Sequence, residues 1–247
     1  QSLYKMSEKH FSQYGAVFGD ECHLFKSKSL TTLMTKLKDC KYRIGTTGTL
    51  DGTHTHKLVV EGLFGVVHNV TTTTKLIEKN LLSKLVIDCI NLQYPMKDIE
   101  SVKRATYQDE IKWIITHEKR NAFITSLCSS MKGNTLLLFN FVEHHGKPLF
   151  NRIRSECGDR KVFFIHGGTD TEQREYIRKI IDKEKNAILI ASYGTCSTGI
   201  NIKNIHNIIF SSPSKSVVRV LQSIGRGLRK SNDKDHVKLY DISDNLN

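Results

Sequence analysis

The second half of the chain alternates short apolar runs with longer segments whose apolar residues recur at helical spacing. The apolar runs predict strands at 135–141, 161–165, 187–191, 207–211 and 237–241. The segments between them predict helices at 107–131, 144–156, 171–183 and 216–229. Strands that alternate with helices form a parallel sheet covered on both faces. We therefore expect an α/β fold whose ligand chemistry follows the ends of the strands, at Phe141, Ile165, Ala191 and Ser211.

The first half shows the same alternation less regularly. Its pattern predicts a polar helix over 3–14, a strand over 16–18, an amphipathic helix over 29–37 and a short strand from Tyr42. Residues 71–74 are polar and β-prone, 84–92 predict a strand, and Pro95 opens a hydrophilic stretch. We expect one domain over 1–75, a linker with a connecting strand over 76–106, and a second domain over 107–247.

The charge balance is strongly basic. The 37 lysine and arginine residues exceed the 25 aspartate and glutamate residues, which gives a formal net charge of +12. Polyanions are the natural partners of such a chain, nucleic acid first and anionic membrane second. Charge alone is equally compatible with a basic protein that binds neither. An apolar content of 38% argues against a disordered chain.

Cysteine and histidine spacing argues against disulfides and metal cages. The six cysteines, at 22, 40, 89, 128, 157 and 196, contain no C-x-x-C pair, so we interpret them as free thiols in a reducing compartment. His54, His56, His144 and His145 lack a full ligand set. No apolar run reaches the roughly eighteen residues of a membrane span. The chain begins at Gln1, almost directly on candidate functional sequence, and we expect it to be truncated at the N-terminus.

The first candidate site follows the apolar run at 16–18, which ends in Asp20, Glu21 and His23. Neighbouring residues of a strand point to opposite faces, but beyond the carboxyl end of a parallel strand both carboxylates can address one crevice. There, one carboxylate can hold Mg²⁺ through its waters while the other orients or deprotonates an attacking water. A chance acidic pair at a strand end is the alternative.

Three further loops at predicted strand ends are rich in glycine and hydroxyl groups. The Thr/Gly loop at 46–49 suits contact with phosphate or a neighbouring acid, although an ordinary polar turn explains it as well. The H-G-G stretch at 166–168 precedes a helix in which Thr169 and Glu172 have capping-box spacing; its N-terminus can bind phosphate, or the stretch is a turn only. The loop over 192–201 can bind a nucleic-acid backbone on one face and a nucleotide on the other.

The stretch Q-S-I-G-R-G-L-R at 222–229 carries the most specific pattern. Arg226 and Arg229 are three residues apart, so on a helix they project from the same side. Two such guanidinium groups match the charge that develops on a transferred phosphoryl group. A basic helix end that complements its dipole is the alternative. Gly225 and Gly227 argue against it, because glycine is costly in a helix unless the backbone must approach something closely.

In chain order, D-E-C-H, T-G-T, H-G-G, S-T-G-I-N and Q-S-I-G-R-G-L-R resemble motifs II, III, IVa, V and VI of the superfamily 2 helicases and translocases, and those of phage recombination helicases in particular. The resemblance implies two RecA-like domains that clamp ATP while DNA lies across both. Residues 1–75 would then be the C-terminal part of the first RecA-like domain and 107–247 the second. For a phage-encoded protein it also implies the host cytoplasm.

The resemblance assigns roles to individual residues. It implies that Asp20 coordinates Mg²⁺, that Glu21 activates the hydrolytic water, and that His23 and Gln222 couple the domains. Arg226 and Arg229 would contact the ATP phosphates from the second domain, and Gly199 and Asn201 would lie near the nucleotide. The residues implied at the DNA, or between it and the nucleotide site, are Thr47, Thr49, His166, Gly167, Gly168, Ser192 and Thr198.

The chain departs from the family pattern at three points. Cys22 stands where alanine is commoner and Leu50 where many members have proline, and we expect both to be tolerated. The third departure is an absence, because the 247 residues contain no G-x-x-x-x-G-K-[ST] phosphate-binding loop. We therefore expect an ATP-dependent DNA helicase or translocase that remodels branched recombination, replication or repair intermediates, here without ATPase by itself.

Two alternatives stay open on the sequence. The chain can be a non-enzymatic module that binds DNA or a partner protein, such as a recombination or replication protein. It can also be the duplex-translocating motor subunit of a restriction or remodelling system. The first alternative predicts salt-sensitive DNA binding with no ATP turnover, and the second predicts movement on duplex without strand separation.

Overall fold

The structure is a computed structural model that describes residues 3–50, 54–199, 202–214, 216–230 and 234–246. The chain divides into two compact units, Gln1–Thr72 and Thr73–Asn247. The division falls close to the expected end of the first domain at residue 75. The strand expected in the linker belongs to the sheet of the second unit, where it pairs with the last strand. None of the described helices is long and apolar enough to cross a membrane.

The first unit contains a two-stranded parallel sheet with helices on one side. Strand β1 (Ala16–Gly19) pairs in parallel with β2 (Tyr42–Gly45), and Ala16 lies opposite Tyr42. The other elements are the 3-10 helices η1 (Leu3–Lys5) and η2 (Cys22–Lys26) and the helices α1 (Glu8–Phe11), α2 (Lys28–Lys36) and α3 (His54–Phe64). The unit has its own apolar core, formed by Phe11, Cys22, Phe25, Met34, Leu37, Cys40 and Val60.

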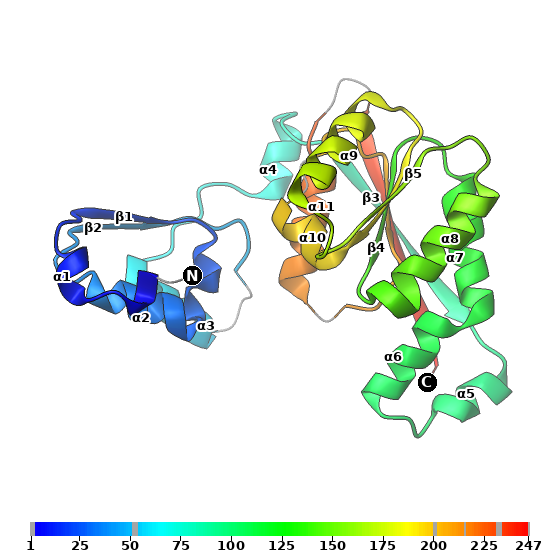
Figure 1. The fold of residues 1–247 in the computed structure, drawn as a ribbon, viewed down its shortest axis with the longest axis horizontal. Coiled ribbons are helices and arrows are strands. Elements are labelled where there is room, and N and C mark those ends of the chain that lie inside the picture. The colour runs from blue at the N-terminus through cyan, green and yellow to red at the C-terminus, as the bar shows by residue number, and fades with distance from the viewer. Residues whose placement is uncertain (1–2, 51–53, 200–201, 215, 231–233, 247) are drawn as a thin grey trace. The chain divides into compact units, whose positions relative to one another are not determined.

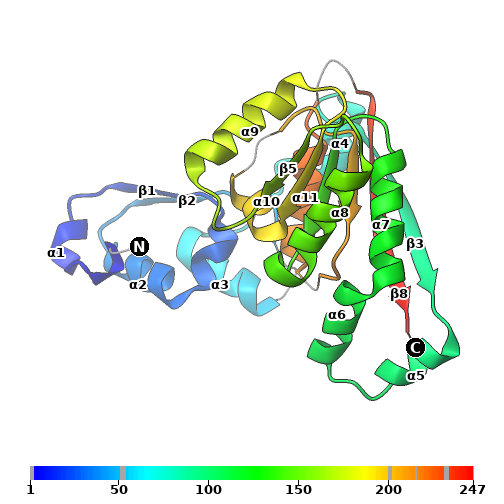
Figure 2. The ribbon, with the colours of Figure 1, turned by 45° about the vertical axis from the view of Figure 1, so that its right-hand side comes forward.

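The second unit is a six-stranded sheet in which every pair of neighbouring strands is parallel, with the order β3-β8-β7-β4-β6-β5. The strands are β3 (Lys84–Gln93), β4 (Thr135–Phe139), β5 (Val162–Ile165), β6 (Ile188–Ser192), β7 (Asn207–Phe210) and β8 (His236–Asn245). The helical elements are α4 (Thr73–Glu78), α5 (Met96–Val102), α6 (Tyr107–Thr116), α7 (Glu118–Ser130), η3 (Val142–Gly146), α8 (Lys147–Glu156), α9 (Thr171–Lys183), α10 (Tyr193–Gly199) and α11 (Val217–Gly227). The expected parallel α/β architecture is confirmed (Figures 1 and 2).

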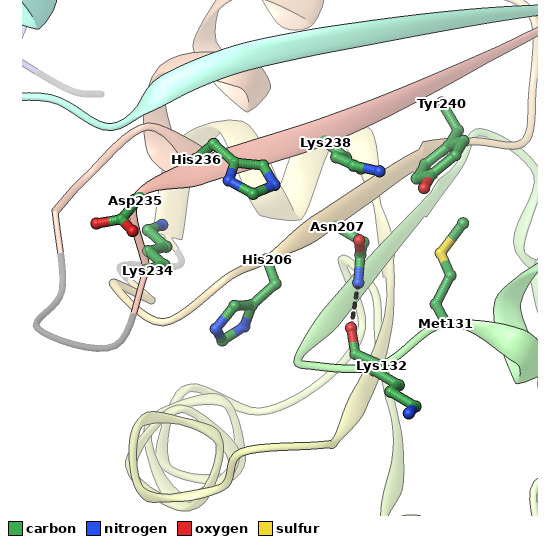
Figure 3. A pocket seen from close by; sticks show the side chains of 9 residues that line it. All are labelled: Met131, Lys132, His206, Asn207, Lys234, Asp235, His236, Lys238 and Tyr240. Atoms are coloured by element: carbon green, nitrogen blue, oxygen red, sulfur yellow. Dashed lines mark hydrogen bonds between the residues drawn. The ribbon is translucent and has the colours of Figure 1, made fainter.

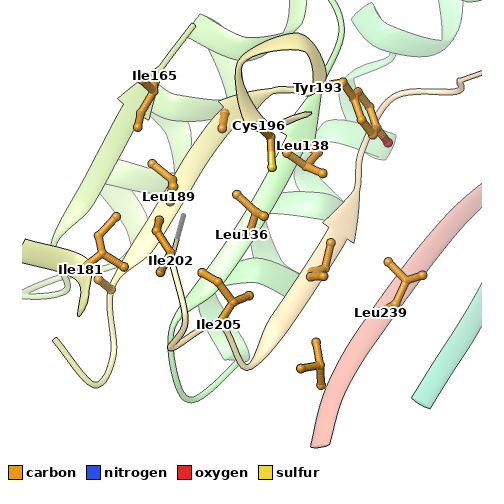
Figure 4. Close-up of a cluster of buried hydrophobic side chains, with 14 of the residues drawn as sticks. Leu136, Leu138, Ile165, Ile181, Leu189, Tyr193, Cys196, Ile202, Ile205 and Leu239 are labelled. Atoms are coloured by element: carbon orange, nitrogen blue, oxygen red, sulfur yellow. The ribbon is translucent and has the colours of Figure 1, made fainter. Parts of the chain in front are cut away.

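Each face of this sheet is covered by its own set of helices, because successive strand residues point to opposite faces. Leu136 and Leu138 of β4 belong to a core cluster with side chains of α9 and α10 (Figure 4), and side chains of α11 pack against this cluster. Leu137 and Phe139 pack on the other face with side chains of α7 and α8. Strands β4 and β7 are buried along their whole length, as expected for central strands of a parallel sheet covered on both faces.

Several element boundaries differ from those predicted. The expected helix at 107–131 is two helices that break at His117, whose ring nitrogen Nδ1 caps α7 by accepting from the Arg120 amide at 3.2 Å. The helix expected at 144–156 begins instead with the π-helical turn η3. The β-prone threonines at 71–74 were misinterpreted, since α4 starts at Thr73. Helices α3, α5 and α10 were not predicted.

A buried polar network holds the carboxyl edge of the six-stranded sheet together. Arg120 donates from Nε to Asp244 Oδ1 at 2.7 Å and from a terminal nitrogen to the Ser211 carbonyl at 2.8 Å. The ring nitrogen Nδ1 of His145 lies 2.8 Å from Ser212 Oγ, which accepts from the Asn140 amide at 3.1 Å. These contacts fix the residues that directly follow β4 and β7, so the loops at this edge start from defined positions.

The network contains a histidine that stays neutral in the folded state. Burial, with a smaller contribution from the charge of Arg120, lowers the pKa of His145 to about 3. In the unfolded chain this histidine binds a proton near pH 6.5, whereas in the folded chain it stays neutral down to about pH 3. The free energy of unfolding therefore falls as the pH drops from 6.5 towards 3. The full effect is about 5 kcal/mol.

We predict that His145→Asn removes much of the loss of stability between pH 7.5 and 5, measured as the free energy of unfolding in urea. The neighbouring His144 is exposed, and His144→Asn should keep the acid sensitivity of the parent chain. Equal acid sensitivity in the parent and His145→Asn chains would contradict the neutral buried histidine.

Candidate functional site

The first group of candidate residues lies where β1 and β2 end. The two strands are parallel, so Asp20 and Glu21 leave the same edge as the Thr/Gly loop that follows β2. Backbone hydrogen bonds join the two loops: the Thr46 amide donates to the Gly19 carbonyl and the Cys22 amide to the Thr46 carbonyl, both at 2.9 Å. The structure therefore brings together the two acids and the hydroxyl loop.

Glu21 adopts an unusual backbone conformation. Its φ and ψ are 49° and 48°, in the left-handed region that costs a residue with a side chain about 1–2 kcal/mol. The carboxylate of Asp20 supports the turn, because Oδ1 accepts from the Glu21 amide at 2.9 Å and from Thr46 Oγ1 at 3.3 Å. Such strain persists where the surroundings impose it and is concentrated at functional sites.

His23 connects the acidic turn with the Thr/Gly loop. Its side chain is buried, and Nδ1 lies 2.8 Å from Thr47 Oγ1 and 3.2 Å from Glu21 Oε2. The Thr47 hydroxyl donates to the Thr49 carbonyl at 3.1 Å, so its oxygen accepts from a protonated Nδ1 of His23. A displacement of Glu21 or His23 would therefore be felt directly at Thr47.

Two buried oxygens beside this chain of contacts make no hydrogen bond with the described residues. They are Thr49 Oγ1 and Glu21 Oε2, and the second has only the 3.2 Å contact with His23 Nδ1, which is an ion pair when the imidazole is protonated. Buried polar atoms are normally satisfied, and the exceptions mark places where a ligand or water belongs. Burial, together with the charges of Glu21 and Asp20, raises the pKa of the Cys22 thiol, so this cysteine is a neutral part of the turn.

The residues suit Mg²⁺ bound mainly through other ligands. The exposed Asp20 carboxylate is a hard oxygen donor, and the described residues include no cluster of three or more histidine, cysteine or acidic groups for a protein cage. Mg²⁺ commonly takes one or two carboxylates and completes its octahedron with waters and substrate phosphates. Asp20 fits that pattern.

The second group lies at the carboxyl edge of the six-stranded sheet. After β5, the H-G-G turn is held by its own side chains: His166 Nδ1 accepts from the Gly168 amide at 3.1 Å, and Arg174 donates to the carbonyls of Gly167 and Thr169, both at 2.8 Å. The turn is therefore preformed, with Gly167 and Gly168 exposed.

The predicted capping box is wrong. Asp170 is the N-cap of α9 and accepts from the Glu172 amide at 3.0 Å, while Thr169 Oγ1 accepts from the His166 amide at 3.0 Å. A carboxylate therefore already occupies the helix N-terminus that the sequence offered to a phosphate. Any backbone contact in this region falls to the glycine turn itself.

The hydroxyl-rich stretch after β6 is a helix and not the expected loop. Ser192 Oγ accepts from the Thr195 amide at 3.3 Å and starts α10. Thr198 and Gly199 lie in its last turn, and the side chain of Thr198 lies outside the description. Asn201 lies outside the described residues.

Helix α11 carries Gln222 and Arg226 but ends at Gly227, so Arg229 lies beyond it and does not share a helical face with Arg226 as predicted. The side chain of Arg226 is outside the description. Gly227 meets the expectation of a close approach, since a Cβ there would lie 2.4 Å from Ile208 Cδ1 of β7, whereas a Cβ on Gly225 would meet nothing within 4 Å.

Sequence reasoning missed the residues that fix these loops. Asn140, Ser212 and the buried His145 hold the ends of β4 and β7, and Lys234 contacts the end of α11. The usable signal was position, because Asn140 and Ser212 lie one and two residues after strands that end in apolar runs, Leu136–Phe139 and Ile208–Phe210. Lys234 carried no such signal.

We predict that Glu21→Gly gives a more stable chain than Glu21→Ala, by about 1 kcal/mol in the free energy of unfolding of the first unit. Both variants lose the carboxylate, but only glycine accepts the left-handed backbone without strain. Chemical denaturation followed at residues of the first unit measures the difference. Equal stability, or a more stable alanine variant, would argue against strain at Glu21.

Comparison with known proteins places this geometry in a family. The helicase conserved C-terminal domain matches residues 118–231. The ATP-dependent DNA helicase uvsW of Enterobacteria phage T4 is 36% identical over 247 residues, which cover 99% of this chain and 49% of that protein. A protein of Acanthamoeba polyphaga mimivirus named as an ATP-dependent RNA helicase, L396, is 23% identical over 99% of this chain and 46% of its own length.

Solved structures agree with the fold. The crystal structure of T4 UvsW matches 100% of this chain and 48% of that chain, with a TM-score of 0.57 and 34% identity. The DNA-bound ATP-dependent Type ISP restriction-modification enzyme LlaBIII matches 97% of this chain and 19% of that chain, with a TM-score of 0.63, but at 15% identity it supports the fold alone. The chain spans about half the length of the curated relatives it matches. It belongs to the superfamily 2 helicases and carries their conserved C-terminal domain.

Proposed function

We propose that this chain forms part of an ATP-dependent DNA helicase or translocase that remodels branched recombination, replication or repair intermediates. The observation that carries the proposal is the contact chain from Glu21 through His23 to Thr47. It joins a strained acidic turn to a hydroxyl loop, which is what a motor needs if events at a nucleotide are to reach nucleic acid. Similarity to a relative named as an ATP-dependent DNA helicase supports the same function.

Each candidate site residue of the first unit has a proposed role in ATP hydrolysis or in its coupling to nucleic acid. Asp20 would hold Mg²⁺ through water, and bound Mg²⁺ supplies charge neutralisation for the phosphates of ATP. Glu21, whose Oε2 is buried and makes no hydrogen bond with the described residues, would orient and deprotonate the attacking water. His23 would sense the position of Glu21 and pass it to Thr47, and from there to Thr49 through their hydrogen bonds.

The second unit would supply the nucleic-acid grip and the remaining nucleotide contacts. The preformed turn at His166, Gly167 and Gly168 lies at one edge of the sheet, where its exposed glycine backbone suits phosphates. Ser192 and Thr198 would add hydroxyl contacts to the same phosphates. Gly199 and Asn201 would lie near the nucleotide, and Gln222, Arg226 and Arg229 would act on it from this unit. The net charge of +12 favours affinity for any nucleic-acid backbone.

DNA is the proposed substrate because the more similar relative, at 36% identity, is named as a DNA helicase and the RNA helicase is 23% identical. We expect turnover only where residues outside these 247 supply a phosphate-binding loop, since the sequence has none. The proposed cofactors are therefore ATP and Mg²⁺, shared between this chain and that loop.

We predict that Glu21→Gln, in a protein that joins this chain to its phosphate-binding loop, lowers the kcat of DNA-stimulated ATP hydrolysis by about a hundredfold or more while ATP still binds. Glutamine keeps the shape and loses the base. Glu8→Gln removes an exposed acid paired with Lys38 and should leave turnover unchanged. Turnover by Glu21→Gln at the level of the parent protein would overturn the assignment.

A DNA-binding module without enzymatic activity is the second candidate, and the missing phosphate-binding loop favours it. It predicts DNA affinity that falls steeply with salt and no DNA-stimulated ATP hydrolysis in the intact protein. The same hydrolysis measurement on the parent protein therefore separates the two candidates.

A further inference from the structure

The polypeptide directly after α11 is held in place by three separate contacts. The last carbonyls of a helix have no partner within the helix and need one from elsewhere. At the end of α11, Lys234 Nζ donates to the Gly227 carbonyl at 2.6 Å and to the Ile205 carbonyl at 2.9 Å. One buried ammonium group therefore ties the end of α11 to the segment that leads into β7.

The next two residues are fixed from the other side. The Ser83 amide donates to the Leu228 carbonyl at 2.8 Å, and Leu82 forms an isolated antiparallel bridge with Arg229. Leu228 is also buried in the core beneath α11. Residues 227–229 each make a backbone contact with another segment. The backbone of Arg229 is therefore held in place, although Arg229 lies beyond the end of α11.

The segment that contacts Arg229 lies in the connection between α4 and β3, near the start of the second unit. The second unit begins at Thr73 with α4, and the amides of Leu81 and Leu82 both donate to the Leu76 carbonyl of that helix, at 2.9 and 3.3 Å. Asn80 forms the turn between the end of α4 and Leu81, and its backbone is left-handed, with φ of 58°. The connection therefore passes from α4 to Arg229 through hydrogen bonds within the second unit.

Lys234 is an unusual residue for this task. Its side chain is almost fully buried, at 6% exposure, and burial lowers the pKa of its amine to about 8. A buried ammonium group costs stability unless it is well paired, and here its recorded partners are two backbone carbonyls. It sits at the rim of a cavity of about 440 Å³ at the amino ends of β7 and β8, which Lys238 and His236 also line (Figure 3).

We propose that Lys234 is a positioning residue for Arg229: with Leu82 and Ser83 of the connection, it fixes the end of α11 so that Arg229 is held ready for the ATP phosphates. This inference rests on the proposed function, because it needs Arg229 to act on the nucleotide. The positive charge also lies at a helix C-terminus, where it is favoured by the helix dipole. Movement of the connection would reach Arg229 through Leu82 and Ser83 without passing through the sheet.

The first test needs no enzymatic activity. Hydrogen exchange of the backbone amides at 226–230 is compared in the parent chain, Lys234→Met and Lys238→Met. Methionine has nearly the length of lysine but cannot donate a hydrogen bond. Lys238 is the matched control, because it is a lysine that lines the same cavity. We expect at least about tenfold faster exchange in Lys234→Met only. Unchanged exchange in this variant, or equal acceleration in Lys238→Met, would overturn the positioning role.

The second test is a double-mutant cycle on DNA-stimulated ATP hydrolysis in the intact protein. Lys234→Met should lower kcat about tenfold with KM for ATP within about twofold, and it should cost little more when Arg229→Ala is already present. If the loss of kcat in the double variant equals the product of the losses in the two single variants, the proposal is overturned. A parent protein without ATP hydrolysis would instead refute the proposed function, and the exchange comparison would still decide whether Lys234 fixes the segment.

Discussion

The parallel hydrogen bonding of the six-stranded sheet is the constraint on which the rest of the second unit depends. Parallel strands send all their carboxyl ends to one edge, so residues that are far apart in sequence emerge side by side. Strands β4 and β7 are buried throughout and leave no freedom of register, because a shift by one residue would turn apolar side chains of one core towards the other. The positions of the H-G-G turn and of Ser192 follow from this register.

Buried polar contacts then fix the segments that leave the carboxyl edge of the sheet. Arg120 and Asp244 form an ion pair whose side chains are 0% and 4% exposed, and Tyr94 donates to the same carboxylate at 2.5 Å. Removing one partner of such a pair leaves a buried charge unpaired, which costs about 3–5 kcal/mol. The pair joins α7 to β8, and its third contact, to Ser211, reaches the end of β7. These contacts therefore tie together the ends of β7 and β8 at the carboxyl edge of the sheet.

The sequence predicted the elements whose side chains alternate in a regular period. Helix α9 was predicted with the observed bounds, 171–183, because its apolar residues recur at helical spacing and its ends carry ordinary signals. Helix α10 was missed because its hydroxyl and glycine residues favour a loop locally; the apolar contacts of Tyr193 and Cys196 with the core override that preference. The break at His117 was missed because a capping histidine has no pattern in the apolar residues around it.

The candidate site was predictable to the same extent. Acids and hydroxyls at strand ends could be found, since their position follows from the strands. The left-handed backbone of Glu21, the tautomer of His23 and the contacts of Arg229 could not, because they depend on atoms contributed by distant segments such as 46–49 and 82–83. The geometry at these residues is set by tertiary contacts that a linear pattern does not contain.

We propose that the carboxyl edge of the six-stranded sheet binds DNA. A hydrogen-exchange footprint of this chain with a forked DNA tests it most directly. We expect slower exchange in peptides that cover 166–169 and 192–196, with no change at the opposite edge, around residues 132–134 and 206–207. Protection confined to the opposite edge, or the absence of protection at a DNA concentration that saturates binding, would contradict it.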